Sequence, residues 1–376
     1  MAVLPALALI ALAANSQENV TDAGPGQVLL APDGEYIAAT VKVPGLPGVR
    51  NLVTMRLSDS SASAVTGFSD THVTDFFWAN DERLVFSVGK LRDNDTKEEY
   101  RGSFSILRDG SGGRKLQQRR VRRRTGNQIS HGAPPRLLNR LPTDWNSVLI
   151  SRIEPSAAFP EVLVLDVLTG RAKRVLASQL SVTRWIVDNS GAVRAAVDKG
   201  DDVLDGKHRL LYRDTADGEW RVLANFNDDE LEVLNFHADN RRLIVLARNE
   251  PGGSALHFLD SSGELSERLF SDPGFDLRNR VGAAGLKQAA QGQMIFYQYM
   301  ADELRTVYFE TRWESRQQTI DEALADTTNT IISWSDDERK LLVHATDSHG
   351  ASDYYLYDTT YRELNFLQPP AVWVRH

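Results

Sequence analysis

The feature of this sequence that most constrains its fold is a short hairpin pattern that recurs along almost the whole chain. Each copy has an apolar stub, then a turn rich in Asp, Asn, Gly or Ser, then a run of β-forming residues. These turn residues suit hairpins because they tolerate the backbone angles that tight turns need. Seven copies occur, at residues 29–41, 76–88, 140–152, 185–197, 235–247, 287–299 and 332–345.

The spacing of these copies predicts one repeated structural unit. Measured between their first turn residues, successive copies are 45 to 64 residues apart. Those turn residues are Asp33, Asn80, Asp144, Asn189, Asp239, Gln291 and Asp337. Repeats of about this length are typical of the blades of β-propellers.

A second hairpin follows each copy, and several of these segments alternate apolar and polar residues, as half-buried strands do. They cover residues 51–68, 103–117, 161–176, 209–226, 255–270, 306–320 and 353–367. Two hairpins per unit give four strands per unit. We therefore expect an all-β, seven-bladed β-propeller with four-stranded antiparallel blades over residues 27–367. Two β-sandwich domains are the alternative, and the absence of a linker between seven like units argues against them.

Two details complete the expected fold. The first and last units each contain both hairpins, so we expect closure by side-chain packing, without strand exchange between the chain ends. The stretch 304–325 is ambiguous, and a short helix is expected near residues 320–324. Residues 368–376 are expected to form a C-terminal tail.

The N-terminal segment has the character of an export signal. Residues 2–14 are almost purely apolar, and the small residues Ala14 and Ser16 fit a cleavage site. This predicts a signal peptide over residues 1–16 and a periplasmic or secreted protein. No Lys or Arg precedes Lys42, so the usual basic leader is missing, and a buried apolar strand or helix is the alternative. The run is shorter than the roughly 20 residues that span a membrane, so no membrane span is expected.

Several segments resemble bacterial peptidases of the prolyl oligopeptidase family. Residues 31–41 (APDGEYIAATV) are similar to the first blade of those proteins, residues 78–87 (WANDERLVFS) to the second, and residues 331–358 to the last. The turn at residues 108–116 (RDGSGGRKL) also resembles theirs. Each motif is short, and the resemblance rests on their shared order from about residue 27 to residue 367.

The resemblance implies a protein with two domains that have separate roles. In that family a seven-bladed propeller accompanies an α/β-hydrolase domain with a Ser-Asp-His triad and admits only short peptides to it. Only nine residues follow residue 367, so the hydrolase domain is expected to be absent. The chain would be a fragment, a split gene product or a degenerate relative.

Motifs for catalysis were sought and are weak. A nucleophile elbow requires Gly-x-Ser-x-Gly, which the sequence lacks; the nearest match is Gly252-Gly253-Ser254, within an expected turn. We therefore expect no catalytic residue and no enzymatic activity in this chain alone.

Motifs for metals and cofactors are equally weak. Two histidines, His344 and His349, have no third ligand in view, and the acidic run 93–95 lacks the Gly and Glu of a calcium loop. The glycine-rich stretch 110–115 lacks the spacing of a phosphate loop. The chain has no cysteine, which excludes disulfides and Cys-ligated zinc. No cofactor and no metal are expected.

One charge run stands out in the longest gap between repeats. It contains Arg119, Arg120, Arg122, Arg123 and Arg124. A solvated loop whose arginines pair with nearby acids is one interpretation, and a surface that docks an anion or a partner is the other. No aromatic residue lies between these arginines and the net charge is −8, so nucleic acid is not an expected partner.

Two functions follow as hypotheses. The first is a non-catalytic propeller that gates substrate for an exported serine peptidase cleaving short peptides, with an α/β-hydrolase domain or short peptides as partners. The second is a stand-alone periplasmic propeller that acts as a protein-interaction scaffold. The pair Glu98-Glu99 matches only by composition the acidic pair of dipeptidyl members of the family, so we assign it no role.

Overall fold

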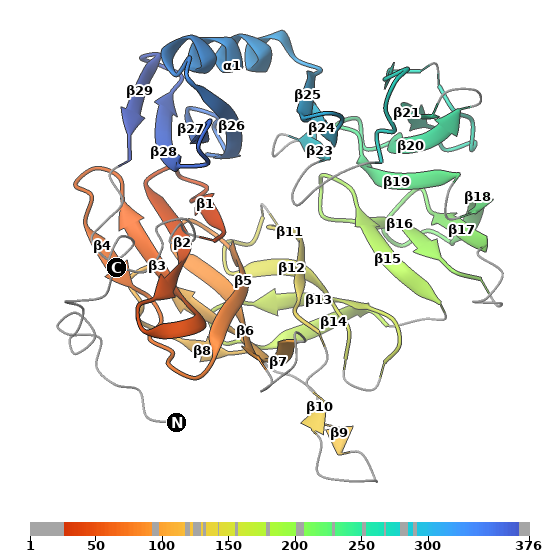
Figure 1. Cartoon of the computed structure of the whole chain (residues 1–376). Coiled ribbons are helices and arrows are strands. Elements are labelled where there is room, and N and C mark those ends of the chain that lie inside the picture. The colour runs from red at the N-terminus through yellow and green to blue at the C-terminus, as the bar shows by residue number, and fades with distance from the viewer. Residues whose placement is uncertain are drawn as a thin grey trace. The chain divides into compact units, whose positions relative to one another are not determined.

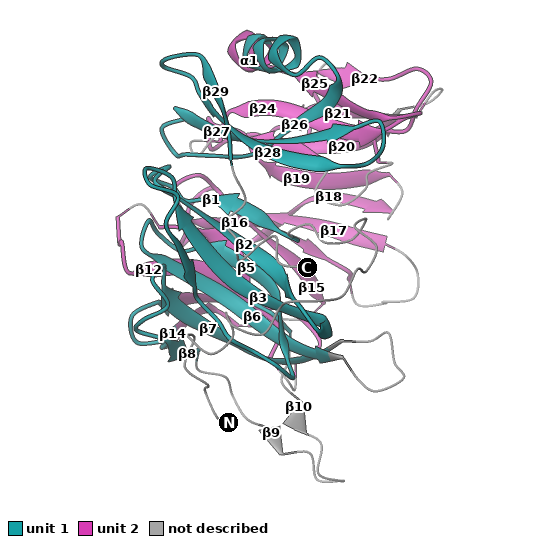
Figure 2. Ribbon diagram, turned by 60° about the vertical axis from the view of Figure 1, so that its left-hand side comes forward, with its two compact units in different colours: residues 1–135, 165–172, 315–376 teal, residues 136–164, 173–314 magenta. Residues whose placement is uncertain are grey.

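The computed structural model describes most of the chain, in two compact units that we treat separately. One unit comprises residues 1–135, 165–172 and 315–376, and the other comprises residues 136–164 and 173–314 (Figure 2). The described residues are 26–91, 98–116, 121–122, 129–130, 133–141, 143–154, 157–177, 181–200, 207–227, 230–249, 253–266, 268–278, 285–288 and 292–367. The expected signal peptide and C-terminal tail lie outside them.

The first unit contributes three complete sheets, each a meander in which strand order follows sequence order (Figure 1). The first sheet consists of β1 (Val28–Leu30), β2 (Tyr36–Val43), β3 (Leu46–Arg56) and β4 (Ala62–Ala64). The second consists of β5 (His72–Trp78), β6 (Arg83–Leu91), β7 (Glu98–Leu107) and β8 (Arg114–Lys115). The seventh consists of β26 (Thr327–Trp334), β27 (Lys340–Asp347), β28 (Ser352–Asp358) and β29 (Glu363–Phe366).

The other four sheets lie mostly in the second unit, and their strands follow the same meander order. The third sheet is β11 (Arg136–Asn139), β12 (Ser147–Arg152), β13 (Glu161–Asp166) and β14 (Ala172–Leu176). The fourth is β15 (Val182–Val187), β16 (Val193–Asp198), β17 (Lys207–Tyr212) and β18 (Arg221–Asn227). The fifth is β19 (Leu231–Phe236), β20 (Leu243–Asn249), β21 (Gly253–Leu259) and β22 (Phe270–Ser271). The sixth is β23 (Leu286–Gln288), β24 (Met294–Met300) and β25 (Leu304–Tyr308).

This is the blade architecture of a seven-bladed β-propeller, which confirms the predicted fold class. Six of the seven sheets have four strands and the sixth has three among the described residues. A small two-stranded ribbon of β9 (Val121–Arg122) and β10 (Ile129–Ser130) occupies the longest gap between repeats.

The second strand of each sheet is buried on both faces, which explains the apolar runs after the predicted turns. Both β12 and the first six residues of β24 are buried throughout. A single sheet cannot cover both of its faces, so it must pack against a neighbour on each side. In the first unit, Leu52 and Ala38 of the first sheet form one apolar cluster with Phe76 and Leu84 of the second.

The first and last sheets meet inside the first unit, and none of their described strands is exchanged between them. Among the described residues, the first sheet comes wholly from the N-terminal hairpins and the last wholly from the C-terminal ones, as predicted. Val28 and Ile37 share an apolar cluster with Leu342 and Tyr354. The N–H of Leu30 also donates to Ser333 Oγ at 3.0 Å. Side-chain packing and a few hydrogen bonds therefore join the two sheets.

The prediction for residues 306–320 was partly wrong. After β25 the chain does not return as a fourth strand; it forms a 13-residue helix, α1 (Thr311–Ala323). The helix begins earlier and is longer than the short segment expected at residues 320–324. Residues 312–318 (RWESRQQ) lack period-two alternation and are mostly good helix formers, and Trp313 anchors the helix by complete burial against Phe296.

Candidate functional site

The turns that predicted the fold also supply the polar groups of the candidate site. In most of the first turns of the sheets, an Asp or Asn side chain accepts hydrogen bonds from backbone N–H groups two or three residues further on. This holds for Asp33, Asn80, Asp144, Asp188, Asp239 and Asp337. Such bonds satisfy turn amides that the strand ladders leave unpaired.

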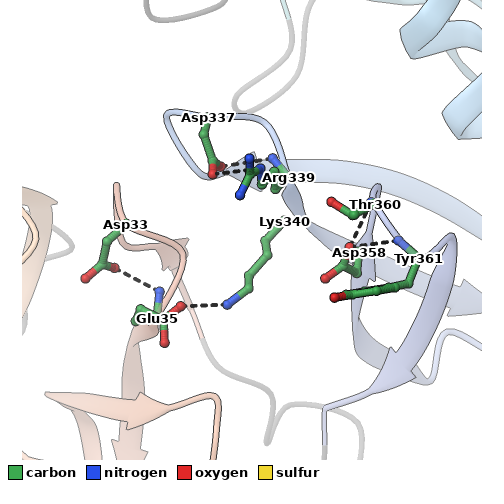
Figure 3. Close-up of a pocket in the computed structure, with 8 residues that line it drawn as sticks. All are labelled: Asp33, Glu35, Asp337, Arg339, Lys340, Asp358, Thr360 and Tyr361. Carbon is green, nitrogen blue, oxygen red and sulfur yellow. Dashed lines mark hydrogen bonds and ion pairs between the residues drawn. The ribbon is translucent and has the colours of Figure 1, made fainter.

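Two of these first turns and one later turn surround a small polar hollow in the first unit (Figure 3). They are the β1–β2 turn of the first sheet and the β26–β27 and β28–β29 turns of the seventh. The hollow has a volume of about 220 Å³ and is lined by Asp33, Glu35, Asp337, Arg339, Lys340, Asp358, Thr360 and Tyr361. This is below the roughly 300–1,000 Å³ of ordinary small-molecule sites, so it suits a single side chain.

Lys340 ties the two sheets together at the hollow. Its Nζ donates to Glu35 Oε1 at 2.8 Å and to the carbonyl oxygen of Gly34 at 3.0 Å. Only about a quarter of the Lys340 side chain is exposed. Gly34 has φ +70, and a Cβ there would lie 3.1 Å from Lys340 Cδ, so a larger residue would press on the lysine.

The Asp358 and Asp337 carboxylates are held in place by their own turns. Asp358 accepts the N–H groups of Thr360 at 2.8 Å and Tyr361 at 3.2 Å. Asp337 accepts the N–H of Arg339 at 3.0 Å and the hydroxyl of Ser335 at 2.6 Å. Partial burial alone would raise the pKa of Asp337, but these bonds outweigh it and hold the pKa below its usual range.

The charge balance of the hollow favours a cation. Four carboxylates (Asp33, Glu35, Asp337 and Asp358) line it with two basic groups (Arg339 and Lys340), and Arg108 pairs with Asp33 at 3.3 Å, which leaves one carboxylate in excess. The ring of Tyr361 is 73% exposed and adds an aromatic surface that can contact a cation. The arrangement can therefore bind a Lys or Arg side chain, but it presents no group placed to cleave one.

The sequence did not identify this hollow. Asp33 and Asp337 were predicted only as turn residues, and Glu35, Lys340 and Asp358 were not singled out. The signal was present in the charged turns 32–35 (PDGE) and 336–340 (DDERK). Their proximity depends on the contact between the first and last sheets, which the sequence does not reveal residue by residue.

Ser254, the nearest match to a nucleophile, has a structural role. It is completely buried in β21. Its Oγ donates to Asp276 Oδ1 and accepts the N–H of Leu277 at 2.8 Å. Hydrogen bonds from Arg278 and Ser254 hold the pKa of Asp276 well below its usual range despite partial burial.

The histidines within and just after β27 do not form a relay. Ser348 Oγ lies 3.4 Å and Asp347 Oδ2 4.0 Å from the same ring atom, Nδ1 of His349. A catalytic relay needs the serine and the acid on opposite ring nitrogens. His344 packs on Tyr354 with ring centroids 5.0 Å apart, and burial lowers the pKa of His344.

The remaining sequence candidates fall into turns or outside the described residues. The glycine-rich stretch forms the β7–β8 turn, with Gly110 at φ +84 and Gly112 at φ +62. Glu99 accepts a hydrogen bond from Arg101 at 3.1 Å. The acidic run 93–95 lies outside the described residues.

The arginine run stays a prediction. Arg122 belongs to β9 by its backbone. The side chains of Arg119, Arg120, Arg122, Arg123 and Arg124 all lie outside what the structure describes.

The described part of the chain has neither a cluster of metal-ligating side chains nor a helix that could span a membrane. Within it, no group of three or more His, Asp or Glu side chains is placed to hold a metal ion. Its helix is too short and too polar to cross a membrane.

Comparison with known proteins shows which solved structures this fold resembles. No protein-family model matches the sequence, and no curated protein matches it. The solved β-propeller domain of the Trilobed protease from Pyrococcus furiosus, described as having an open velcro topology, is similar with a TM-score of 0.53. The two are 9% identical over 93% of this chain and 97% of that one.

Two larger proteins are similar over part of their length. A puromycin hydrolase gives a TM-score of 0.51 at 14% identity, covering 94% of this chain and 57% of that chain. A puromycin-hydrolyzing peptidase from Mycobacterium tuberculosis gives 0.53 at 12% identity, covering 93% and 54%. This chain therefore spans a little over half the length of those two proteins. In fold, the chain is similar to the β-propeller domains of prolyl oligopeptidase-family peptidases.

Proposed function

We propose that this chain is the non-catalytic, substrate-gating propeller of an exported serine peptidase of the prolyl oligopeptidase type, which cleaves short peptides. Its partner in this proposal is an α/β-hydrolase domain. The observation that carries the proposal is the similarity to an isolated protease propeller along nearly the full length of both chains. The match to only a little over half of two puromycin-hydrolysing proteins supports it.

The geometry of the serine and histidine side chains is consistent with a non-catalytic role. Ser254 is buried and its hydroxyl donates to Asp276. Ser348 and Asp347 both approach Nδ1 of His349, whereas a relay needs the serine and the acid on opposite ring nitrogens. Activity then requires a serine from another domain.

The polar hollow has a place in this proposal as a docking position. Its excess of carboxylates over basic groups suits one Lys or Arg side chain on the surface of the hydrolase domain. Removing two of the carboxylates with Glu35→Gln and Asp358→Asn would weaken such docking without changing the size of either side chain.

A capture experiment tests the proposal. The tagged chain is expected to retain, from an extract of its own cells, a protein that reacts with a fluorophosphonate probe and contains an α/β-hydrolase domain. Retention of a cell-envelope protein without a reactive serine would instead support the scaffold hypothesis. The Glu35→Gln/Asp358→Asn variant is expected to retain less of the hydrolase; equal retention would exclude the hollow as its docking position.

The export part of the proposal rests on the apolar run at residues 2–14. N-terminal sequencing of the protein from fractionated cells checks it. A mature chain that starts after residue 16 in the periplasm or medium is expected, and an uncleaved chain in the cytoplasm would contradict it.

A further inference from the structure

The sixth sheet differs from the other six because its outer position is unoccupied among the described residues. The chain leaves β25 through Phe309 and Glu310 and begins α1 at Thr311, whereas every other sheet adds a fourth strand. Among the described elements, only β24 runs alongside β25. The outer edge of β25 is therefore a sheet edge.

The register of β24 and β25 shows which backbone groups point outward. Phe309 N–H donates to the carbonyl of Ile295, and in an antiparallel pair, hydrogen-bonded and non-hydrogen-bonded residues alternate. With Tyr297 opposite Val307 and Gln298 opposite Thr306, Leu304 and Thr306 direct both their N–H and C=O groups away from β24. Neither residue has a hydrogen-bond partner for those groups among the described residues.

The edge lacks most of the usual protections against pairing, because its one charged side chain, Arg305, is paired with Asp302 and Asp272. Natural edge strands carry prolines, bulges or lysines that discourage a further strand. β25 (LRTVY) has no proline and no lysine, and its pairing with β24 has no register shift. Three of its residues, Thr306, Val307 and Tyr308, are strong β-formers.

The charges around the edge favour a basic partner. Asp302 and Glu303 are exposed just before β25, and Glu310 follows it. Arg305 is paired with Asp302 at 2.8 Å and with Asp272 at 3.3 Å, and Arg312 is paired with Glu310. Four carboxylates thus lie close to two guanidinium groups, so a net negative charge is left.

We propose that the free edge of β25 binds an extended peptide segment of a partner protein, flanked by basic residues, as the fourth strand of the sixth sheet. The backbone of Leu304 and Thr306 offers two donors and two acceptors to that strand. The other outer strands of this chain are two to seven residues long, so a short segment fills the position. This is the β-augmentation mode of peptide recognition.

Fluorescence anisotropy with two synthetic peptides tests the pairing. The probe is Lys-Lys-Val-Thr-Val-Thr-Val-Lys, and the control, Lys-Lys-Val-Pro-Pro-Pro-Val-Lys, has the same charge but lacks three consecutive central N–H donors, so neither of its edges can donate there. The probe is expected to bind at least about tenfold more tightly than the control, because proline cannot donate to a ladder. Equal binding of the two peptides, or no binding of the probe, would overturn the proposal.

Protein variants locate the binding. Thr306→Pro removes an outward N–H and is expected to lower probe affinity about tenfold or more. The matched control is Phe366→Pro on the outward edge of β29, which already is a fourth strand; it is expected to change affinity by less than about twofold. Equal loss in both variants would overturn the assignment to β25. Far-ultraviolet circular dichroism of both variants checks that they are folded.

A charge variant keeps the test decisive if Thr306→Pro does not fold. Glu303→Lys changes an exposed side chain and is expected to weaken binding of the probe about threefold, with the difference shrinking at high salt. Unchanged affinity would count against the charge argument. Sedimentation analysis adds one more outcome: a dimer that Thr306→Pro converts to a monomer would mean that a second copy occupies the edge, and the proposal would fail.

Discussion

Single carboxylates hold several of the turns between the first and second strands of the sheets, and Asp239 is one of the most extensively bonded. It accepts the N–H groups of Arg241 at 2.9 Å and Arg242 at 3.0 Å, and it pairs with Arg242 Nε at 2.6 Å. Burial alone would raise the pKa of Asp239, but these hydrogen bonds hold it well below its usual range. The charged form of this group is therefore favoured by folding.

Replacing this carboxylate gives the first prediction. Asp239→Ala is expected to lower the free energy of unfolding by about 1–2 kcal/mol at pH 7, as for a lost helix cap. Because the folded pKa is depressed, the contribution is complete above the unfolded pKa of about 3.9 and is lost as pH falls toward the folded pKa. The gap between variant and native protein in urea titrations should therefore close on acidification below about pH 4.

The control for this prediction is Asp214→Ala. Asp214 is 70% exposed and makes one surface ion pair with Arg221 at 3.6 Å, so a change within about 0.5 kcal/mol is expected. A gap for Asp239→Ala that persisted unchanged at pH 3 would show that its carboxylate does not act through its charge.

The sequence predicted most of the turn residues whose side chains accept hydrogen bonds. It did not predict which residues of other sheets these turns contact. Asn189 lies in its turn as expected, but Asp188 before it accepts the turn amides, and Asn189 Nδ2 donates to His237 O at 2.9 Å and to Asn240 Oδ1 at 2.7 Å in the next sheet. Asp and Asn both suit a turn. Which of the two binds the turn amides here depends on a contact with residues about 50 positions away in the sequence. Gln291 lies outside the described residues.

At the scale of the element, glycines in the outer turns let one sheet approach the next. Gly263 follows β21 with φ +90, and a Cβ there would lie 2.8 Å from the carbonyl oxygen of Leu223 in β18. Gly200 follows β16 with φ +73, and no atom of the described residues lies within 4 Å of the corresponding Cβ position. The two glycines share the left-handed backbone and differ in the contact.

This difference gives the second prediction. Gly200→Ala is expected to cost about 1 kcal/mol, which is the strain of a side chain in the left-handed region. Gly263→Ala is expected to cost about 2–3 kcal/mol, because the methyl group also collides with backbone that cannot rotate away. Urea unfolding of the two variants measures both, and equal losses would mean that the sheets separate easily at this turn.

The strands were predictable from the sequence because turn residues and β-forming runs alternate, whereas α1 and the hollow were not. Thr306–Tyr308 form a strand, the residues that follow are mostly good helix formers, and the extent of their helix is set by the burial of Trp313 against Phe296, which the sequence does not show. The hollow needs Glu35, Lys340 and Asp358 side by side. Their separation of up to 323 residues in sequence leaves no local pattern to detect.

At the scale of the molecule, the contact between the first and last sheets replaces a shared strand. It depends on the apolar cluster of Val28, Ile37 and Leu342 and on the bonds of Lys340 to Glu35 and Gly34. Because the chain has no native cysteine, introduced thiols can report on this contact without interference.

Cross-linking gives the third prediction. Glu35→Cys combined with Lys340→Cys is expected to be joined rapidly by a short bismaleimide, since the native side chains meet at 2.8 Å. The control pair, Glu35→Cys with His349→Cys, should react far more slowly. β27 rises about 3.4 Å per residue from Lys340 to Asp347, and His349 lies in the turn beyond its far end, which puts the two positions far apart. Equal rates would contradict the direct contact between the first and last sheets.

The central claim is that this chain is a propeller that serves a peptidase without supplying its nucleophile, and active-site labelling tests it most directly. The purified 376-residue chain is treated with a fluorophosphonate and weighed by intact-mass spectrometry, beside trypsin as a positive control, and is assayed with chromogenic dipeptides. The expected result is an unmodified mass and no hydrolysis. A single phosphonylated serine together with peptide turnover would contradict the account.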